Sequence, residues 1–269
     1  MYPNRIVCLT EETTETLYLL GEQDRIVGIS GFTVRPPRAR KEKPKVSAFT
    51  SANIEAILAL KPDLVLGFSD LQADIAATLI RHGINVYIFN QRSVAEIFSM
   101  IAQLGGIVGA QDNAQQLIVK LQSNIDHALM VAEKFPQRPR VFFEEWYDPL
   151  ISGIGWVSEL VGIAGGDDIF PELAQEPGAK QRIIADPLQV VARAPDIIMG
   201  SWCGRKFKPE KVVAREGWEN VPAVRNQQLF EVKSPLILQP GPAALSDGLA
   251  ALQSIISQWA VGLHVSNTK

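Results

Sequence analysis

The sequence predicts an α/β protein of two similar lobes, each with a mainly parallel sheet, joined by one long rigid helix. Short apolar runs alternate with segments of helical periodicity through both halves of the chain, which is the pattern of parallel sheets. A Pro-Asp strand entry occurs at Pro62 and again at Pro195. Arg5 and Arg140 open the first strand of each half at nearly the same offset, which indicates a repeated architecture.

The first lobe, residues 1–112, begins with alternating strands and helices. RIVCLT at 5–10 and RIVGIS at 25–30 are rich in β-branched residues, and apolar side chains recur at helical spacing between them. PDLVLGF at 62–68 and INVYIF at 84–89 continue the alternation, with another helical segment between them. Four such strands favour a parallel sheet that helices cover on both faces.

A single helix is predicted at 113–135, between the lobes. Leu117, Leu121, Ile125 and Leu129 recur every four residues, and polar residues fill most other positions. A helix of roughly 22 residues is on the order of 30 Å long, which is enough to bridge two lobes. Because the chain has no Gly/Ser-rich linker here, we expect the lobes to be held at a nearly fixed separation.

The second lobe, residues 136–269, repeats the plan of the first. RVFFEE at 140–145 is predicted as a strand and WVSELVGIAGG at 156–166 as a helix. A further helix leads into the strand PDIIMGS at 195–201.

Composition excludes several classes of function. The formal net charge of −3 lacks the basic excess of a protein that binds nucleic acid. No apolar stretch reaches the roughly 18 residues of a membrane span, so a membrane-spanning protein is not expected. The first residues do not resemble a signal peptide, so a cytoplasmic location is expected for the sequence as given, and a periplasmic one if a leader was removed.

The crevice beyond the carboxyl ends of the strands is where ligands bind in parallel sheets. Aromatic rings there would offer flat apolar surfaces, while arginines would donate to polar groups of a large ligand. A tryptophan in such a position can equally pack into the core, and a cation can equally be solvated. The ligand-binding candidates are Glu11, Phe32, Arg35, Phe68, Ser69 and Arg92 in the first lobe, and Glu145, Trp146, Trp156, Trp202, Cys203, Arg205 and Pro235 in the second.

The sequence does not show the set of residues that a catalytic site would need. Cys203 is the one candidate nucleophile, because Arg205 and Lys206 could lower its pKa. No histidine is predicted beside it, and the scarcity of histidine also argues against a site for a bare transition metal. We therefore expect no catalytic residue, no metal ligand set and no required cofactor, which leaves a binding protein.

Several segments resemble one known family. The run IVCLTEETTETLYLLGEQDRIVGIS, the segment NIEAILALKPDLVLGF and the segment VSELVGIAGGDDIF look like the substrate-binding proteins of metal-chelate ABC importers, which bind vitamin B12, haem or ferric siderophores. The resemblance covers nearly the whole chain. It implies the helical-backbone, periplasmic-binding-protein-like fold, with a ligand between two lobes and an ABC importer permease as partner.

The vitamin B12-binding members are the most similar, through RPPRARKEKPKV and its spacing to DLVLGF. By this resemblance Phe68 matches an aromatic ligand contact, and Asp74 matches the first-lobe acid that docks onto the importer. Leu188 falls near the second docking acid, and Arg35 falls where the proline-pair loop carries a tyrosine. The first departure argues against docking, and the second argues for a ligand other than B12 itself.

The main hypothesis is a non-catalytic binding protein for cobalamin or a related corrinoid chelate, as an intracellular relative of the importer receptors. A ferric-siderophore or haem receptor is the alternative within binding. An enzyme that uses Cys203 on a corrinoid or nucleotide-like ligand is the alternative from another class.

Overall fold

A computed structural model describes the backbone of residues 2–266 and the side chains of residues 2–262. The chain divides into two compact units. Unit 1 comprises Met1–Gln91 and Ala95–Leu121, and unit 2 comprises Arg92–Val94 and Gln122–Lys269. The boundary between them falls inside one long helix, α6 (Gln111–Ala132).

Unit 1 is built on a six-stranded sheet in the order β4-β3-β2-β1-β5-β6. Its neighbouring strands run parallel, except for the antiparallel pair β3 and β4. Every residue of β5 is buried, as expected for a central strand with helices on both faces. The strands are β1 (Ile6–Cys8), β2 (Ile26–Ser30), β3 (Lys45–Ala48), β4 (Ser51–Ala52), β5 (Leu64–Phe68) and β6 (Val86–Phe89).

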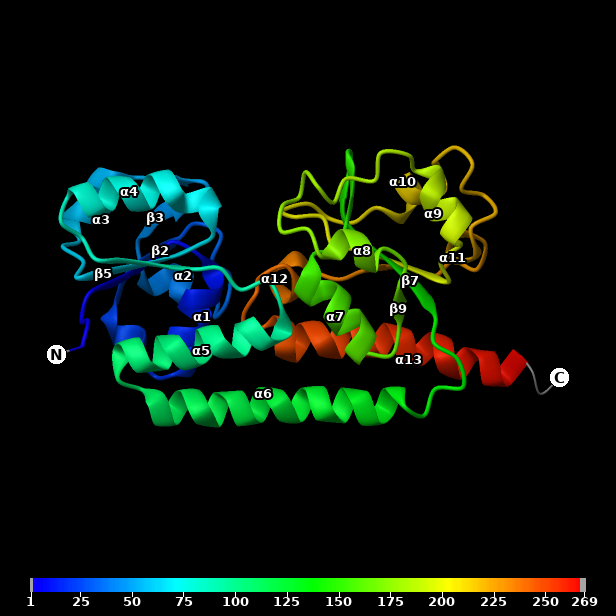
Figure 1. The fold of residues 1–269 in the computed structure, drawn as a ribbon, viewed down its shortest axis with the longest axis horizontal. Helices are drawn as coiled ribbons and strands as arrows, with labels where there is room; N and C mark the ends of the chain where they lie inside the picture. Colours follow the sequence, from blue (N-terminus) through cyan, green and yellow to red (C-terminus); the bar gives the residue numbers. More distant parts are fainter. Residues whose placement is uncertain (1, 267–269) are drawn as a thin grey trace. The chain divides into compact units, whose positions relative to one another are not determined.

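Helices cover both faces of this sheet (Figure 1). On one face, Ile57 of α3 and Leu79 of α4 pack with Val7 and Val65 of the sheet. The Asn53 side chain caps α3 by accepting a hydrogen bond from the Ala56 backbone N–H at 2.9 Å. The helices are α1 (Glu11–Leu19), α2 (Ala39–Glu42), α3 (Ile54–Ala59), α4 (Ala73–Arg81) and α5 (Val94–Val108), with short 3-10 turns at Gln23–Arg25 and Asp70–Gln72.

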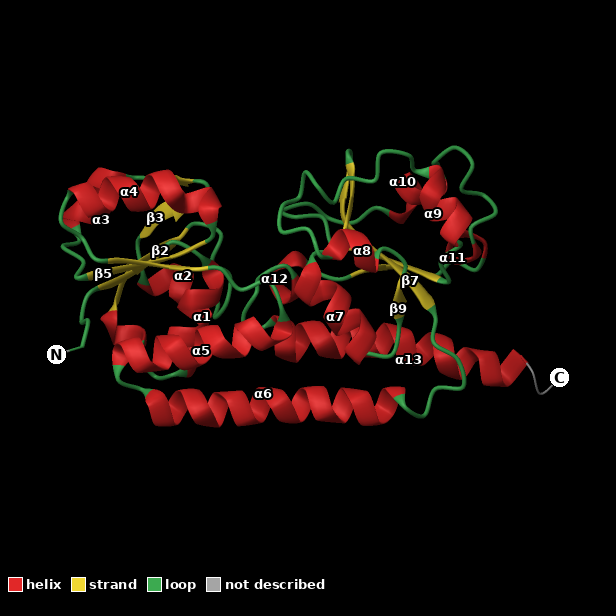
Figure 2. Ribbon diagram, in the orientation of Figure 1, coloured by secondary structure: helices red, strands yellow, loops and turns green. Residues whose placement is uncertain are grey.

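Unit 2 contains a five-stranded sheet in which β11-β10-β7-β8 are neighbours and β9 also pairs with β7 (Figure 2). β10 runs parallel to β7 and β11, whereas β7 and β8 form an antiparallel hairpin. The carboxyl ends of β7 and β10 therefore lie next to each other at one sheet edge. The strands are β7 (Arg140–Tyr147), β8 (Leu150–Ser152), β9 (Asp167–Asp168), β10 (Ile197–Gly200) and β11 (Leu229–Glu231).

The core of unit 2 is rich in aromatic side chains. Phe142 of β7 lies edge-on to both Phe170 and Trp218, at centroid distances of 5.7 and 6.3 Å. Four of its short helices begin with a proline in the first turn, where the missing N–H costs nothing. The helices are α7 (Gly155–Ile163), α8 (Pro171–Ala174), α9 (Leu188–Arg193), α10 (Pro209–Val213), α11 (Pro222–Arg225), α12 (Ser234–Ile237), a π-type turn at Ala244–Gly248, and α13 (Leu249–Ser266).

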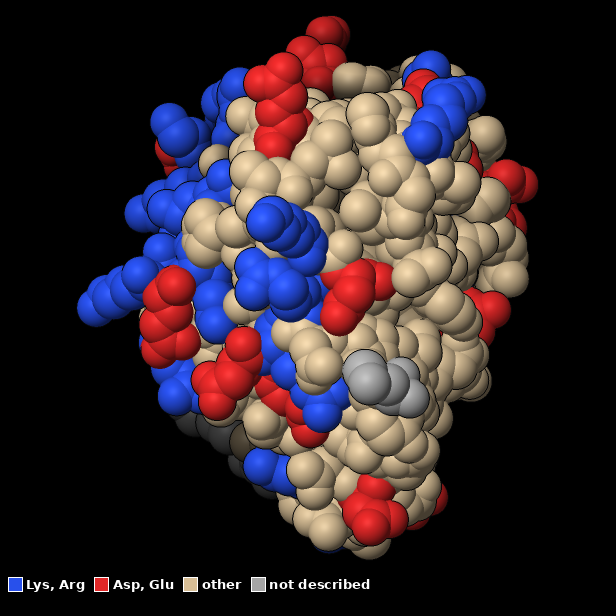
Figure 3. All heavy atoms as spheres, turned by 90° about the vertical axis from the view of Figure 1, so that its left-hand side faces the viewer, with Lys and Arg blue, Asp and Glu red and all other residues tan. Residues whose placement is uncertain are grey.

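The predicted fold class is confirmed, because each unit is an α/β structure whose sheet is mainly parallel. The cation-rich segment 35–45 is partly regular in structure. It contains the short helix α2 and then leads into β3. The side chain of Ala39 is fully buried, whereas Arg38 and Lys41 are exposed. Figure 3 shows that lysine and arginine side chains on the presented face of unit 1 are interspersed with acidic ones.

Candidate functional site

Two carboxyl groups begin α1, directly after the first strand of unit 1. Glu12 is 1% exposed, and the Thr10 hydroxyl donates a hydrogen bond to its Oε1 at 2.6 Å. Burial raises the pKa of Glu12 to about 8, so the group is held as a neutral acid at neutral pH. Burial also raises the pKa of Glu11, which is half-buried. Of the two, Glu11 is the one that reaches the surface.

The turn after β5 is closed by its own hydrogen bonds. The Phe68 backbone N–H donates to Gln72 Oε1 at 2.9 Å, and Gln72 Nε2 donates to the Phe49 carbonyl at 2.7 Å. Ser69 has a φ of 61° and is 2% exposed. A Cβ at Gly67 would lie 2.6 Å from Gln72 Oε1, so a larger residue there would displace the side chain that accepts from the Phe68 N–H. Phe68 is 5% exposed, so this predicted contact presents only a small part of its ring.

Phe32 and Arg35 follow β2 and differ in their surroundings. Phe32 is 56% exposed, which is unusual for a large apolar ring. Arg35 Nε lies 2.7 Å from Glu15 Oε1, and their side chains are 30% and 9% exposed. Arg35 is thus positioned by an acid of α1.

The two predicted docking positions lie on helices at the surface. Asp74 is exposed in the first turn of α4, where a negative charge is favoured by the helix dipole. Leu188, the first residue of α9, is 54% exposed.

In unit 2, a buried ion pair holds the end of β7. Glu144 is fully buried, and Arg215 approaches both of its carboxylate oxygens at 2.7 and 2.8 Å. The Trp202 indole N–H donates to Glu144 Oε1 at 2.9 Å. A carboxylate with three such donors is well compensated for its loss of water. It ties β7 to the loop after β10.

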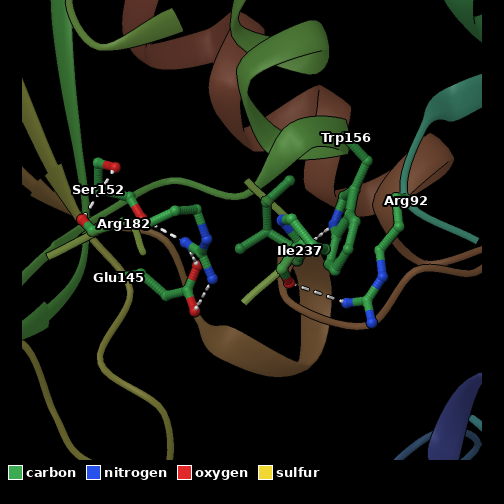
Figure 4. Close-up of polar contacts among 7 residues, drawn as sticks. Arg92, Glu145, Ser152, Trp156, Arg182 and Ile237 are labelled. Atoms are coloured by element: carbon green, nitrogen blue, oxygen red, sulfur yellow. Dashed lines mark hydrogen bonds and ion pairs between the residues drawn. The ribbon is translucent and has the colours of Figure 1, made fainter. Parts of the chain in front are cut away.

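The next residue, Glu145, is held by Arg182, which is a buried arginine (Figure 4). Arg182 is 1% exposed, and its Nη1 and Nη2 lie 2.6 and 3.0 Å from the two Glu145 oxygens. Arg182 also donates to the Ser152 carbonyl, while its own carbonyl accepts from the Ser152 backbone N–H at 3.1 Å. The register of the β7–β8 pair shifts between Glu144 and Trp146, so Glu145 lies at an irregularity of the hairpin, and Arg182 ties it there to Ser152 of β8.

Three rings gather at the end of this strand, and we call Trp146, Tyr147 and Trp202 the aromatic platform. Tyr147 is central, with ring centroids 5.1 Å from Trp146 and 4.6 Å from Trp202. Trp146 and Tyr147 are half-buried, whereas Trp202 is 3% exposed. Trp202 therefore supports the platform from within the core, and the ring surface that faces solvent comes from Trp146 and Tyr147.

Two cations border the platform. Arg205 Nη1 donates to the Tyr147 hydroxyl at 2.7 Å, and its guanidinium carbon lies 5.5 Å from the Trp146 ring centroid. Lys211 Nζ lies 4.2 Å from the Tyr147 ring centroid. Both cations are exposed, and both distances fall within the range of cation–π attraction.

Three further predicted ligand contacts belong to unit 2 and are not part of the aromatic platform. Trp156 is 3% exposed, and its indole N–H donates to the Ile237 carbonyl at 2.8 Å, so this ring is part of the core (Figure 4). Arg92 is half-buried and donates to the Pro177 carbonyl at 3.3 Å. Pro235 is half-buried in the first turn of α12.

Cys203 is exposed and does not take part in a disulfide bond. Among the side chains of residues 2–262, no group of three or more histidine, cysteine, aspartate or glutamate residues is arranged to hold a metal ion. Within the same described part, the helices are all too short or too polar to cross a membrane.

Sequence reasoning missed the cations that organise the site. Arg182, Arg215 and Lys211 come from three separate segments, none of which directly follows a strand. A signal was available only in their partners, because two consecutive glutamates at a strand end demand buried counter-charges.

The family model described as periplasmic binding protein matches residues 6–236, which is most of the chain. The chain belongs to the periplasmic binding protein family. The family description is that of a binding protein, which agrees with an exposed aromatic platform bordered by cations.

Two relatives match this periplasmic binding protein over most of its length. An uncharacterized ABC transporter substrate-binding lipoprotein of Bacillus subtilis strain 168, YvrC, is 28% identical over 94% of this chain and 80% of its own. A vitamin B12-binding protein of Vibrio parahaemolyticus is 26% identical over 90% of this chain and 86% of its own. Among solved structures, a periplasmic haem-binding protein from Roseiflexus sp. RS-1 has the same fold, with a TM-score of 0.79 and 22% identity over 94% of this chain and 99% of its own.

Proposed function

We propose that this protein is the solute-binding component of an ABC importer and that its ligand is a cobalamin-like corrinoid chelate. The observation that carries the proposal is the aromatic platform with its bordering cations, held at the carboxyl ends of β7 and β10 by two buried ion pairs. The similarity to a vitamin B12-binding protein supports the same ligand class.

A corrinoid suits this surface for physical reasons. Its macrocycle is broad and flat, and its rim carries hydrogen-bonding groups. Trp146 and Tyr147 offer ring faces that can stack on an apolar macrocycle. Arg205 offers donors at the edge of those rings. Because the buried ion pairs fix the platform before the ligand arrives, little side-chain entropy is lost on binding.

The proposal also assigns contacts to the strand ends of unit 1. Phe32 is the ring with the greatest exposure among the predicted contacts there, and Glu11 and Arg35 are half-buried beside the surface. We propose these three residues as ligand contacts, together with a smaller contribution from Phe68. Asp74 is proposed as a docking acid for the importer, since it is exposed on α4.

Haem is the second candidate ligand, and a specific observation favours it. Arg205 and Lys211 place two exposed cations beside flat rings, an arrangement suited to a macrocycle with carboxylate side chains. The similar fold of a haem-binding protein is compatible with this ligand.

Isothermal titration calorimetry with cyanocobalamin tests the proposal. We expect a dissociation constant in the micromolar range or below. Trp146→Ala should weaken binding about tenfold, because one stacked ring contributes on the order of 1 kcal/mol or more. Trp259→Phe, on α13, is the matched control and should leave the affinity unchanged. Absence of heat with cyanocobalamin, together with saturable binding of haemin, would reject the corrinoid in favour of haem.

A further inference from the structure

We propose that Arg205 and Lys211 form a subsite for an oxyanion on the rim of the ligand that stacks on the aromatic platform. This inference rests on the proposed function and specifies the ligand class further. The oxyanion is a carboxylate on the macrocycle or a phosphodiester attached to it.

The two cations are held in place before any ligand binds. Arg205 is fixed by the Tyr147 hydroxyl at 2.7 Å and lies 5.5 and 6.0 Å from the ring centroids of Trp146 and Tyr147. Lys211 approaches the Tyr147 ring at 4.2 Å. Tyr147 thus contacts both the Arg205 guanidinium and the Lys211 ammonium group. Each keeps further N–H donors toward solvent, because both side chains are exposed.

Among the described side chains, neither charge has an acidic partner. Asp148 follows Tyr147, and Glu210 precedes Lys211. Over the described part of the chain, however, neither cation forms an ion pair with these or other carboxylates. Two other arginines of unit 2, Arg182 and Arg215, each form an ion pair with a glutamate, whereas Arg205 and Lys211 do not. Two cations around one ring repel each other, and an oxyanion between them would turn that repulsion into attraction.

The chemistry of the pair selects an acid over an amide. A guanidinium binds a carboxylate or phosphate through a planar fork, and an ammonium adds a second point charge. A neutral carboxamide offers only an uncharged oxygen to the same donors. The platform should therefore stack any corrin ring, while the two cations should distinguish ligands by the charge on the rim.

Three corrinoid probes test this inference by calorimetry. Dicyanocobinamide has an amide rim and no phosphodiester, cyanocobalamin adds the phosphodiester, and dicyanocobyrinic acid replaces the amides with carboxylates. We expect at least one of the two probes that carry an oxyanion to bind about threefold to tenfold more tightly than dicyanocobinamide at low salt, and the advantage to shrink as salt is raised. A phosphodiester subsite favours cyanocobalamin, and a carboxylate subsite favours dicyanocobyrinic acid.

Two charge-removing variants complete the test. Arg205→Gln and Lys211→Gln should each remove most of the advantage of the favoured anionic probe and change dicyanocobinamide affinity less than twofold. Lys134→Gln removes one exposed charge elsewhere in unit 2 and should preserve the advantage. Equal affinity for all three probes, or an advantage that survives both substitutions, would overturn the oxyanion subsite while leaving the corrinoid function standing. Failure of all three probes to bind would reject the corrinoid function and the subsite together.

Discussion

Replacing Arg215 with alanine should destabilise unit 2 by about 3 kcal/mol. The substitution leaves Glu144 fully buried and removes two of its three donors, so the Trp202 N–H remains. Breaking a buried ion pair by removing one partner costs about 3–5 kcal/mol. The lower value applies because the Arg215 side chain is 17% exposed, which lets water reach the vacated position.

Urea unfolding followed by tryptophan fluorescence measures this change specifically. All five tryptophans, at positions 146, 156, 202, 218 and 259, belong to unit 2, so the signal reports on that unit. The same loss should lower the Tm of unit 2 by roughly 6–12 °C.

Two further variants decide whether the buried charge is the cause. Arg225→Ala removes an exposed arginine of α11 and should change the free energy of unfolding by less than about 0.5 kcal/mol. Combining Glu144→Gln with Arg215→Met removes both charges and should restore much of the lost stability. A change below about 0.5 kcal/mol for Arg215→Ala, or no recovery in the double variant, would refute the reasoning.

Three other predictions follow from single side chains. Folding raises the pKa of Glu12 to about 8. The stability that its protonated form supplies is therefore complete below the ordinary glutamate pKa and is lost as the pH rises from about 5 through 8. Glu12→Gln should flatten this part of the profile of stability against pH. Gly200→Ala should cost about 1–3 kcal/mol, because the added methyl group would overlap the buried Phe207 ring. Iodoacetamide should label Cys203 in the native protein and spare Cys8, which is fully buried with a pKa raised by burial.

Each of these has a result that would contradict it. An unchanged pH profile for Glu12→Gln in chemical denaturation would mean that Glu12 does not supply the dependence. Gly162→Ala is the control for Gly200→Ala, since its methyl group meets no atom within 4 Å, and equal destabilisation of both would exclude the proposed overlap. Mass spectrometry that finds both cysteines labelled at the same rate would contradict the burial of Cys8.

The parts of the fold that the sequence predicted are those with strong periodic patterns. The buried runs at 5–10, 62–68 and 195–201 formed strands because their apolar residues are contiguous and their ends carry turn residues. The two-residue strands β4 and β9 have no such pattern. They exist because neighbouring strands supply their hydrogen-bond partners, which a local pattern does not contain.

The candidate site was predicted less completely. Trp146 lies at the carboxyl end of β7 and Arg205 lies in the loop after β10, which are the places that chain order predicts for them. The burial of Trp202 and Trp156 could not be read from the sequence, because an exposed and a buried tryptophan look the same beside a strand.

The sequence by itself determined the α/β class, the strand ends where polar and aromatic residues collect, and the absence of catalytic motifs. These properties depend on residues that are neighbours along the chain. The tertiary structure alone decided which arginine pairs with which glutamate and which rings face solvent, because Arg182 and Arg215 reach Glu145 and Glu144 from segments 37 and 71 residues away. Pairing at that separation is set by how the strands and loops pack, and each buried charge must find its partner there.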